Sequence, residues 1–549
     1  MEDLILKHAL LNAAEHGGKA EIQAVLGRMI SEKPDLRSKI KELISEIKKT
    51  VKEINSWPAK KQEVQMKKLG IKVVEKKIEE KGLPELTNAK VGKVVMRLAP
   101  YPSGPLHIGN ARMILLNDEF VKRYKGKLFL VIDDTIGSEE KHILPEAYDL
   151  ILDGLKWLGV KYHELIYKSG RMEIFYKHAE EMIRKSIAYV CTCPEDVLRE
   201  NRKNGIECPH RKNSVEKNLE LWKNMFESFE EGEAVVRLKT DMKHPNPAFR
   251  DRVLLRIADR DHPRVDRKYR VWPMLEFSWA VDDHLLGITH ILRGKDLVME
   301  DMMEEFIWKK LGWEKPEFIH YGILNIEEAK LSKTESRKAI EIGEYSGWDD
   351  PRTWSLQSLR RRGIQPEAIR KFIIGMGLSL ADVSVPAEIL YAENRKLIDS
   401  ESNRYFAVLN PVEISIKKFP KKVEAPLHPD FPKRGSRKIN VSEKIYVEKD
   451  DFEKFKGKEV GLINLFSVKL EKEAKVTSKK MKMGVQKLQW VPEENVKIKM
   501  VMPDGTAKEG VAESSIKDLK IGQLIQLVRI GFCRTAKADK DIALYYAHK

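Results

Sequence analysis

Residues 94–116 read VVMRLAPYPSGPLHIGNARMILL, and this stretch decides how the surrounding region folds. Its apolar start predicts a short buried strand, its Pro/Gly-rich centre a turn, and its end, with Leu115 and Leu116, a helix. Another buried strand is predicted by the apolar run at residues 128–132, and a helix is expected at residues 147–158. Strand, helix, strand, helix is typical of a parallel sheet with crossover helices. The stretch therefore indicates a Rossmann-like domain.

The rest of the chain has hydrophobic patterns that differ from those of this domain. Leu43, Ile47 and Val51 recur at helical spacing near the start, and alternating short strands with turn signals follow residue 403. We expect a multidomain α/β plus all-β chain, with a barrel or pair of barrels at its C-terminal end. The expected regions are a helical N-terminal extension (1–90), the first half of the Rossmann-like domain (91–185), an insertion with charged helical stretches (186–270), the second half (271–345, with sheet texture at 285–292 and 318–324), a helical linker (346–402) and the β-barrel region (403–549).

Composition narrows the classes of partner. Lys and Arg number 100 against 84 Asp and Glu, a net charge of +16, which favours a polyanion such as nucleic acid. A solvated Lys/Glu-rich surface accounts for the same charge, and charge alone does not choose between them. Acidic residues at positions 2 and 3 argue against a signal peptide, and no apolar window is long enough to span a membrane. Three of the four cysteines lie within residues 191–208, which fits a reducing cytoplasm better than a disulfide framework.

Two segments could bind phosphate. The loop at residues 100–110 joins a predicted strand to a predicted helix, whose free N–H groups suit an anion. His107 could donate to phosphate oxygens and Gly109 allows close approach of a flat base, although a plain Pro/Gly turn with an incidental histidine is the alternative. Downstream, residues 330–334 read KLSKT, and its two lysines could reach a triphosphate. Such Lys/Ser loops are usually just solvated.

Together, the two segments resemble the HIGH and KMSKS signatures of class I aminoacyl-tRNA synthetases. The departures are Asn110 for the second His, Leu331 for Met and Thr334 for Ser. The resemblance implies ATP, with Mg²⁺, as a substrate. It places ATP against Pro100, Tyr101, Pro102, Ser103, Gly104, Pro105, Leu106, His107, Ile108, Gly109, Asn110, Lys330, Leu331, Ser332, Lys333 and Thr334.

The resemblance extends to the glutamyl branch of the archaeal and eukaryotic type. The matching motifs are residues 97–100, 103–112, 133–135, 281–290, 293–294 and 347–352, and the similarity covers most of residues 91–549. The glutaminyl branch usually has two prolines where this chain has an Ala-Pro pair at residues 99–100. By position, Arg97 is expected to pair with a glutamate carboxylate, Arg293 to reach the substrate and Asp133 to hold the α-amino group. A structural salt bridge is the alternative for each. Where the family usually has a tyrosine, this chain has Leu275.

The implied reaction has two steps. L-Glutamate and ATP form glutamyl-adenylate, and the 2′ hydroxyl of the terminal tRNA adenosine then takes the glutamyl group, with tRNA needed before activation. The partners expected are tRNA(Glu), tRNA(Gln) as an additional candidate, and a protein partner for residues 1–90. The insertion should contact the acceptor end, the helical segment at residues 346–402 the stem, and the barrels the anticodon. The alternatives are a glutaminyl-tRNA synthetase, a non-catalytic tRNA-binding paralogue and a truncated relative that modifies a tRNA base.

A cysteine–histidine cluster lies in the insertion. Cys191 and Cys193, followed by Cys208 and His210, give C-x-C and then C-x-H, a set of four donors that suits tetrahedral zinc. No open position is evident, so we expect a structural metal; reduced, unliganded cysteines are the alternative. Cys533 stands alone and is expected to be a buried apolar residue.

Overall fold

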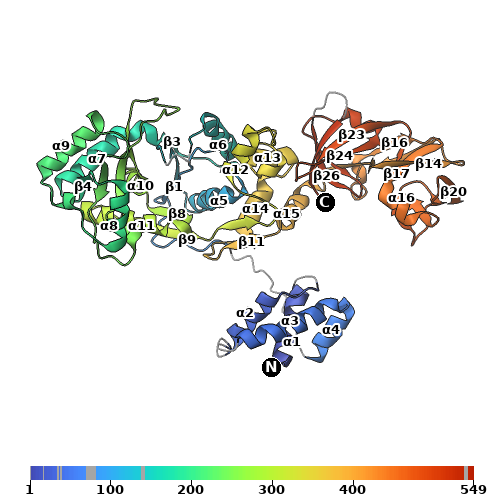
Figure 1. Cartoon of the computed structure of the whole chain (residues 1–549). Helices are drawn as coiled ribbons and strands as arrows, with labels where there is room; N and C mark the ends of the chain where they lie inside the picture. Colours follow the sequence, from blue (N-terminus) through green and yellow to red (C-terminus); the bar gives the residue numbers. More distant parts are fainter. Residues whose placement is uncertain are drawn as a thin grey trace. The chain divides into compact units, whose positions relative to one another are not determined.

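The computed structural model describes residues 2–15, 18–33, 36, 40–69, 82–137, 142–536 and 542–549. The chain forms two compact units, residues 1–81 and 82–549 (Figure 1). No helix of the described ranges combines the length and the apolar character needed to cross a membrane.

The first unit is helical, as the spacing of its apolar residues predicts. Its helices are α1 (Glu2–Glu15), α2 (Ile22–Glu32), α3 (Ile40–Ser56) and α4 (Ala59–Lys68). Ile5, Met29 and Ile47, from three different helices, are completely buried in its own core. The last helix ends at Lys68; residues 70–81 of the predicted extension lie outside the described residues, and 82–93 contain no helix.

The second unit begins with a parallel sheet, which confirms the prediction from residues 94–116. Strands β1 (Val95–Leu98), β2 (Lys127–Ile132) and β3 (Glu164–Tyr167) pair in parallel, with α5 (Ile108–Arg123) and α6 (Pro145–Trp157) between them in the chain. After the insertion, β8 (His290–Gly294) pairs in parallel with β9 (Glu317–Tyr321). β8 lies beside β1, where the N–H of Thr289 donates to Val95 O at 2.9 Å. The two halves of the domain thus meet at β1.

The strand predicted over residues 285–292 is wrong in its first half. Helix α10 (Leu275–Leu285) continues through Leu285, and β8 starts only at His290. Gly287 has φ +62°, and the N–H of Ile288 donates to Asp283 O, so the helix ends in a left-handed turn that the apolar run conceals. The run at 318–324 likewise splits into β9 and β10 (Leu324–Ile326) at Gly322.

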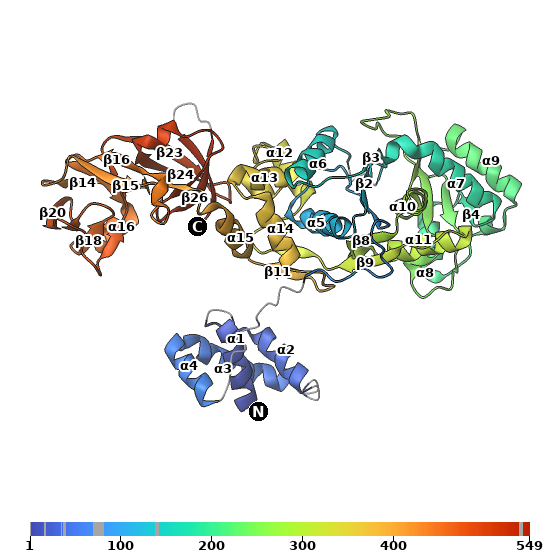
Figure 2. The same ribbon diagram turned by 180° about the vertical axis from the view of Figure 1, so that it is seen from behind.

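The insertion contains a sheet that the sequence did not predict. Strands β4 (Ala188–Cys191), β5 (Val235–Leu238), β6 (Val253–Ile257) and β7 (Val271–Pro273) form a four-stranded antiparallel sheet. Helices α7 (Met172–Arg184), α8 (Glu195–Asn204) and α9 (Val215–Glu227) surround it (Figure 2). Further on, α11 (Val298–Leu311) packs against α10.

Helices follow the second half of the sheet, as expected for residues 346–402. They are α13 (Leu356–Arg362), α14 (Pro366–Gly375) and α15 (Glu388–Ile398). Helix α12 (Lys333–Glu341) precedes this segment, and the short β11 (Val383–Val385) pairs with β10.

Residues 403–549 are β-rich and form two seven-stranded sheets, each with its own apolar core. One sheet has the order β12-β25-β26-β27-β23-β24-β13 and the other β21-β18-β19-β20-β14-β17-β22. The first contains β12 (Asn403–Tyr405), β13 (Ala407–Leu409), β23 (Asn495–Val501), β24 (Ala507–Glu513), β25 (Leu524–Leu527), β26 (Gly531–Ala536) and β27 (Ile542–His548). The second contains β14 (Pro411–Ile416), β17 (Lys444–Glu448), β18 (Glu459–Leu462), β19 (Ser467–Lys469), β20 (Glu473–Ser478), β21 (Gln486–Leu488) and β22 (Trp490–Pro492). A hairpin, β15 (Lys422–Pro426) with β16 (Ser436–Asn440), and helix α16 (Lys449–Phe455) accompany them.

Arginines join the helical segment to this β-rich region. The fully buried Arg362 donates to the carbonyls of Tyr546 and Ala547 in β27, and Arg361 lies 4.3 Å from the ring centre of Tyr545. Arg352 packs so closely on the β23–β24 turn that a methyl group on Gly505 would clash with it. Side chains from two separate segments therefore hold the β-rich region in place.

Candidate active site

The loop at residues 100–110 ends in a complete helix cap. The N–H of Gly109 donates to Nδ1 of His107 at 3.1 Å, and the N–H of His107 donates to Oδ1 of Asn110 at 3.1 Å. Asn110, which replaces a histidine of the signature, therefore caps α5. The loop is held from outside as well, because the N–H of Ile108 donates to Trp354 O at 3.1 Å.

The segment at 330–334 forms the start of α12. Ser332 caps the helix by accepting from the N–H of Glu335. Lys333 Nζ donates to the carbonyl of Gly104 at 3.3 Å, whereas Lys330 is exposed and pairs with Glu335 at 2.7 Å. The structure thus brings Lys333 to the loop at residues 100–110 and leaves Lys330 in solvent.

His107 and Lys333 line the same small cavity, together with Pro105, Ser332 and Trp348. Burial, with the charge of Lys333 nearby, lowers the pKa of His107 to about 3, so its ring is neutral at physiological pH. Loss of water around its ammonium lowers the pKa of Lys333 to about 8. Among the described residues no carboxylate pairs with Lys333. A phosphate group would supply the missing counter-charge.

Arg97, Asp133 and Arg293, predicted to bind the amino acid, also come together. The guanidinium groups of Arg97 and Arg293 lie 4.7 Å and 4.9 Å from the ring centre of Trp279, and Lys168 Nζ lies 5.3 Å from it. All five side chains are more than nine-tenths buried. One indole therefore has three cations around it.

Each of these charges has an internal partner. Arg97 donates through Nε and Nη2 to both oxygens of Asp283, and Lys168 Nζ donates to Asp133 at 3.1 Å. Arg293 has two partners: its Nε donates to Asp301 at 2.6 Å and its Nη1 donates to Glu304 at 2.8 Å. The salt bridges considered as the alternative are therefore present.

Sequence reasoning missed four members of this cluster: Lys168, Trp279, Asp301 and Glu304. Each is a single residue far from the signatures, and only the fold reveals its position. Burial raises the pKa of Glu304 to about 8, so it holds its proton at neutral pH. Leu275, where a tyrosine was expected, is the first residue of α10 and lies one turn before Trp279, next to the cluster.

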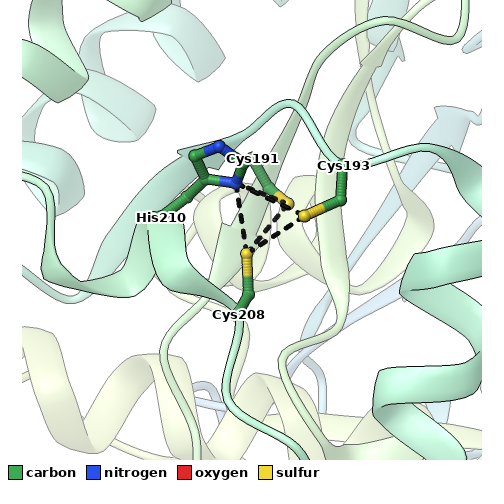
Figure 3. A group of neighbouring side chains, drawn as sticks. All are labelled: Cys191, Cys193, Cys208 and His210. Carbon is green, nitrogen blue, oxygen red and sulfur yellow. Dashed lines mark hydrogen bonds between the residues drawn. The ribbon is translucent and has the colours of Figure 1, made fainter.

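The cysteine–histidine set is assembled at the end of β4 (Figure 3). The Sγ atom of Cys208 lies 3.4 Å from that of Cys191 and 3.5 Å from that of Cys193, and Nδ1 of His210 lies 3.2–3.7 Å from the three sulfurs. Four ligands at zinc bond lengths form a tetrahedron with edges of about 3.5–3.8 Å. Nε2 of His210 lies 3.1 Å from the hydroxyl of Thr192, a contact that can orient the ring.

A cavity of about 710 Å³ lies beside this set. Its charged lining has more arginines than glutamates: Arg199, Arg202, Arg237, Arg252 and Arg256 against Glu195, Glu231 and Glu276. Nη2 of the fully buried Arg237 has no hydrogen-bond partner among the described residues. The cavity therefore suits an anion.

Comparison with known proteins gives one consistent result. Residues 93–399 match the family described as "tRNA synthetases class I (E and Q), catalytic domain", and residues 402–486 and 487–536 match anti-codon binding domains of the same class. The glutamate--tRNA ligase of Methanothermobacter thermautotrophicus is 41% identical over 555 residues, and that of Methanocaldococcus jannaschii is 45% identical over 561 residues. Both alignments cover 100% of this chain and 100% of the relative.

Proposed function

This chain belongs to the class I tRNA synthetases for glutamate and glutamine and is a glutamate–tRNA ligase, and from that premise we propose which residues carry the reaction. The observation on which the proposal rests is the meeting of Lys333 with the His107 loop at the carbonyl of Gly104. Enzymes of this class use ATP with Mg²⁺. The phosphates of ATP lie between the start of α5 and Lys333.

Activation requires no protein nucleophile. A carboxylate oxygen of glutamate attacks the α-phosphorus of ATP, the bond to the β-phosphate oxygen breaks, and pyrophosphate leaves. The negative charge on that leaving group is stabilised by Lys333 and by the positive end of the α5 helix dipole. His107, being neutral, acts as a hydrogen-bonding group. In the second step the 2′ hydroxyl of the terminal adenosine attacks the glutamyl carbonyl and AMP leaves.

The glutamate pocket is the cluster around Trp279. Arg97 is the proposed partner of a glutamate carboxylate, because its Nη1 makes no hydrogen bond to any described residue. Asp133 is proposed to accept from the α-amino group. Each of its oxygens accepts one hydrogen bond, from Lys168 or from the hydroxyl of Thr135, and a carboxylate oxygen can accept a second. Arg293, whose guanidinium lies 4.9 Å from the centre of the same indole, adds positive potential to the pocket.

Charging assays test the assignment. Purified tRNAs for glutamate and for glutamine are incubated with the full chain, ATP, and labelled glutamate or glutamine. Glutamate on the glutamate tRNA is the expected product. Glutamine on its own tRNA would establish the glutaminyl alternative, absence of any charging would establish the non-catalytic one, and glutamate on the glutamine tRNA would add a second RNA substrate.

The tRNA is proposed to contact two regions of the chain. The enzyme is proposed to act in the cytoplasm, where ATP and reduced cysteines are both expected. The arginine-lined cavity of the insertion lies close to the acceptor end, and its guanidinium groups suit backbone phosphates. The barrels in residues 403–549 contact the anticodon. The unit of residues 1–81, which has a core of its own, is proposed to bind a further protein.

A structural zinc ion is proposed for Cys191, Cys193, Cys208 and His210, because their spacing fits a tetrahedral shell. When bound, zinc would tie β4 to the segment around His210 and would take no part in the reaction. Elemental analysis of metal-replete protein should give about one zinc per chain. Cys208→Ser should lose the metal, whereas Cys533→Ser, which changes a buried cysteine elsewhere, should retain it. Equal zinc in both variants, or none in the parent chain, would rule the site out.

A further inference from the structure

We propose that Asp283 is a positioning residue for amino-acid binding: it holds one edge of the Arg97 guanidinium so that the opposite edge faces a substrate carboxylate. The inference rests on the proposed role of Arg97. Asp283 lies in the run at residues 281–290 that resembles the family, but no role could be assigned to it from the sequence.

The contact between the two residues fixes the orientation of the guanidinium plane. Arg97 donates from Nε and from Nη2, the latter at 2.8 Å, so both oxygens of Asp283 are used. A two-pronged pair of this kind fixes direction as well as distance. Of the five N–H groups of the guanidinium, two face Asp283. The two on Nη1 and one on Nη2 remain on the edge turned away from it.

Trp279 restricts the guanidinium from another side. Its ring centre lies 4.7 Å from the guanidinium carbon of Arg97, within cation–π distance. The guanidinium therefore contacts both Asp283 and the indole. Rotation of the side chain would break at least one of these contacts, and the edge that faces neither residue is left for a ligand.

Asp283 is itself held firmly. Its side chain is fully buried, and its backbone carbonyl accepts from the N–H of Ile288 at the end of α10. Two residues beyond Ile288 begins β8, which lies beside β1, the strand that carries Arg97. The pair therefore joins the two halves of the catalytic domain, which the insertion separates in the sequence. The orientation of Arg97 depends on both halves being in register.

The adjacent residue provides a matched control. Asp282 is also on α10, is 1% exposed, and accepts from Nε of Arg171 at 2.7 Å. It is thus a buried aspartate paired with an arginine, but its partner has no proposed contact with the substrate. Comparison of the two neighbours separates the effect of a lost buried ion pair from that of a misdirected Arg97.

The test compares Asp283→Asn with Asp282→Asn in the full chain, using ATP–pyrophosphate exchange in the presence of tRNA. Asparagine keeps the shape but presents an amide group that cannot accept from both nitrogens of Arg97. Asp283→Asn should raise the KM for glutamate about tenfold or more and leave the KM for ATP within about twofold, since one charge-assisted hydrogen bond and the alignment are lost. Asp282→Asn should change neither constant by more than about twofold.

Two results would overturn the inference. One is an equal KM for glutamate in the two variants; the other is a lower KM in Asp283→Asn, which would make Asp283 an internal competitor of the substrate. If Asp283→Asn does not fold, Asp283→Glu keeps the charge and displaces the fork, and it should raise the KM for glutamate; an unchanged KM would contradict the proposal. Arg97→Ala tests the proposed glutamate site separately from the role of Asp283. An unchanged KM for glutamate in that variant would rule out Arg97 as part of the glutamate site.

Discussion

The proposed glutamate pocket and the lysine segment at residues 330–334 differ in whether their buried cations have carboxylate partners. In the pocket, Arg97, Lys168 and Arg293 donate to the buried carboxylates of Asp283, Asp133 and Asp301. In the lysine segment, the half-buried Lys333 donates only to the carbonyl of Gly104. Burying an unpaired charge is costly, and a paired one is fixed in place. The cluster around Trp279 therefore fixes the orientation of its cations, whereas the charge of Lys333 has no carboxylate to offset it.

The largest expected effect concerns the uncompensated charge. Lys333→Ala should slow formation of glutamyl-adenylate by about 10²–10³-fold, because no other described cation donates to the carbonyl of Gly104. ATP–pyrophosphate exchange in the presence of tRNA measures the rate. Binding of tRNA, followed by filter retention, should stay nearly unchanged. A rate equal to that of the parent chain would contradict the proposed role.

Stability should respond in the opposite order. Arg97→Ala leaves Asp283 buried without its partner, and such a change costs about 3–5 kcal/mol. Lys333→Ala removes a charge that had no carboxylate, so its cost should stay within about 1 kcal/mol. Calorimetric melting of both variants checks this, with a clear drop in Tm expected only for Arg97→Ala. Equal melting temperatures would remove the distinction between the two regions.

The pH dependence sharpens the comparison further. The pKa of Lys333 is lowered to about 8, so the free enzyme carries this charge below that pH and loses it above. The value of kcat/KM for ATP, which reports the free enzyme, should be level below about pH 8 and fall about tenfold per unit above it. In the Lys333→Arg variant, whose guanidinium stays charged, this break should be absent. A break at the same pH in that variant would assign it to another group.

The smallest effect is expected for the exposed lysine. Lys330 pairs with Glu335 in solvent, and exposed pairs contribute little. Lys330→Ala should therefore reduce adenylate formation by no more than about threefold in the same exchange assay. A loss as large as that of Lys333→Ala would mean that the segment moves to bring both lysines onto the phosphates.

The parts of the fold with local patterns could be predicted from the sequence. The apolar strand and capped helix at residues 94–116 and the close spacing of Cys191, Cys193, Cys208 and His210 are such patterns. The insertion sheet could not be, because the residues of β4 are buried throughout and so lack the alternation that identifies a strand. Nor could Asp283 be assigned to Arg97, since 186 residues separate them and an isolated aspartate carries no local signal.

The arginine contacts that attach the β-rich region have a consequence for the RNA. Because Arg362 donates to β27 and Arg352 packs on the Gly505 turn, the span between the anticodon-binding barrels and the His107 loop is set by the protein. On the proposed binding of tRNA at both places, the length of the RNA has to match this span. An RNA lengthened by one base pair between its anticodon and its 3′ end would reach one of the two places and miss the other.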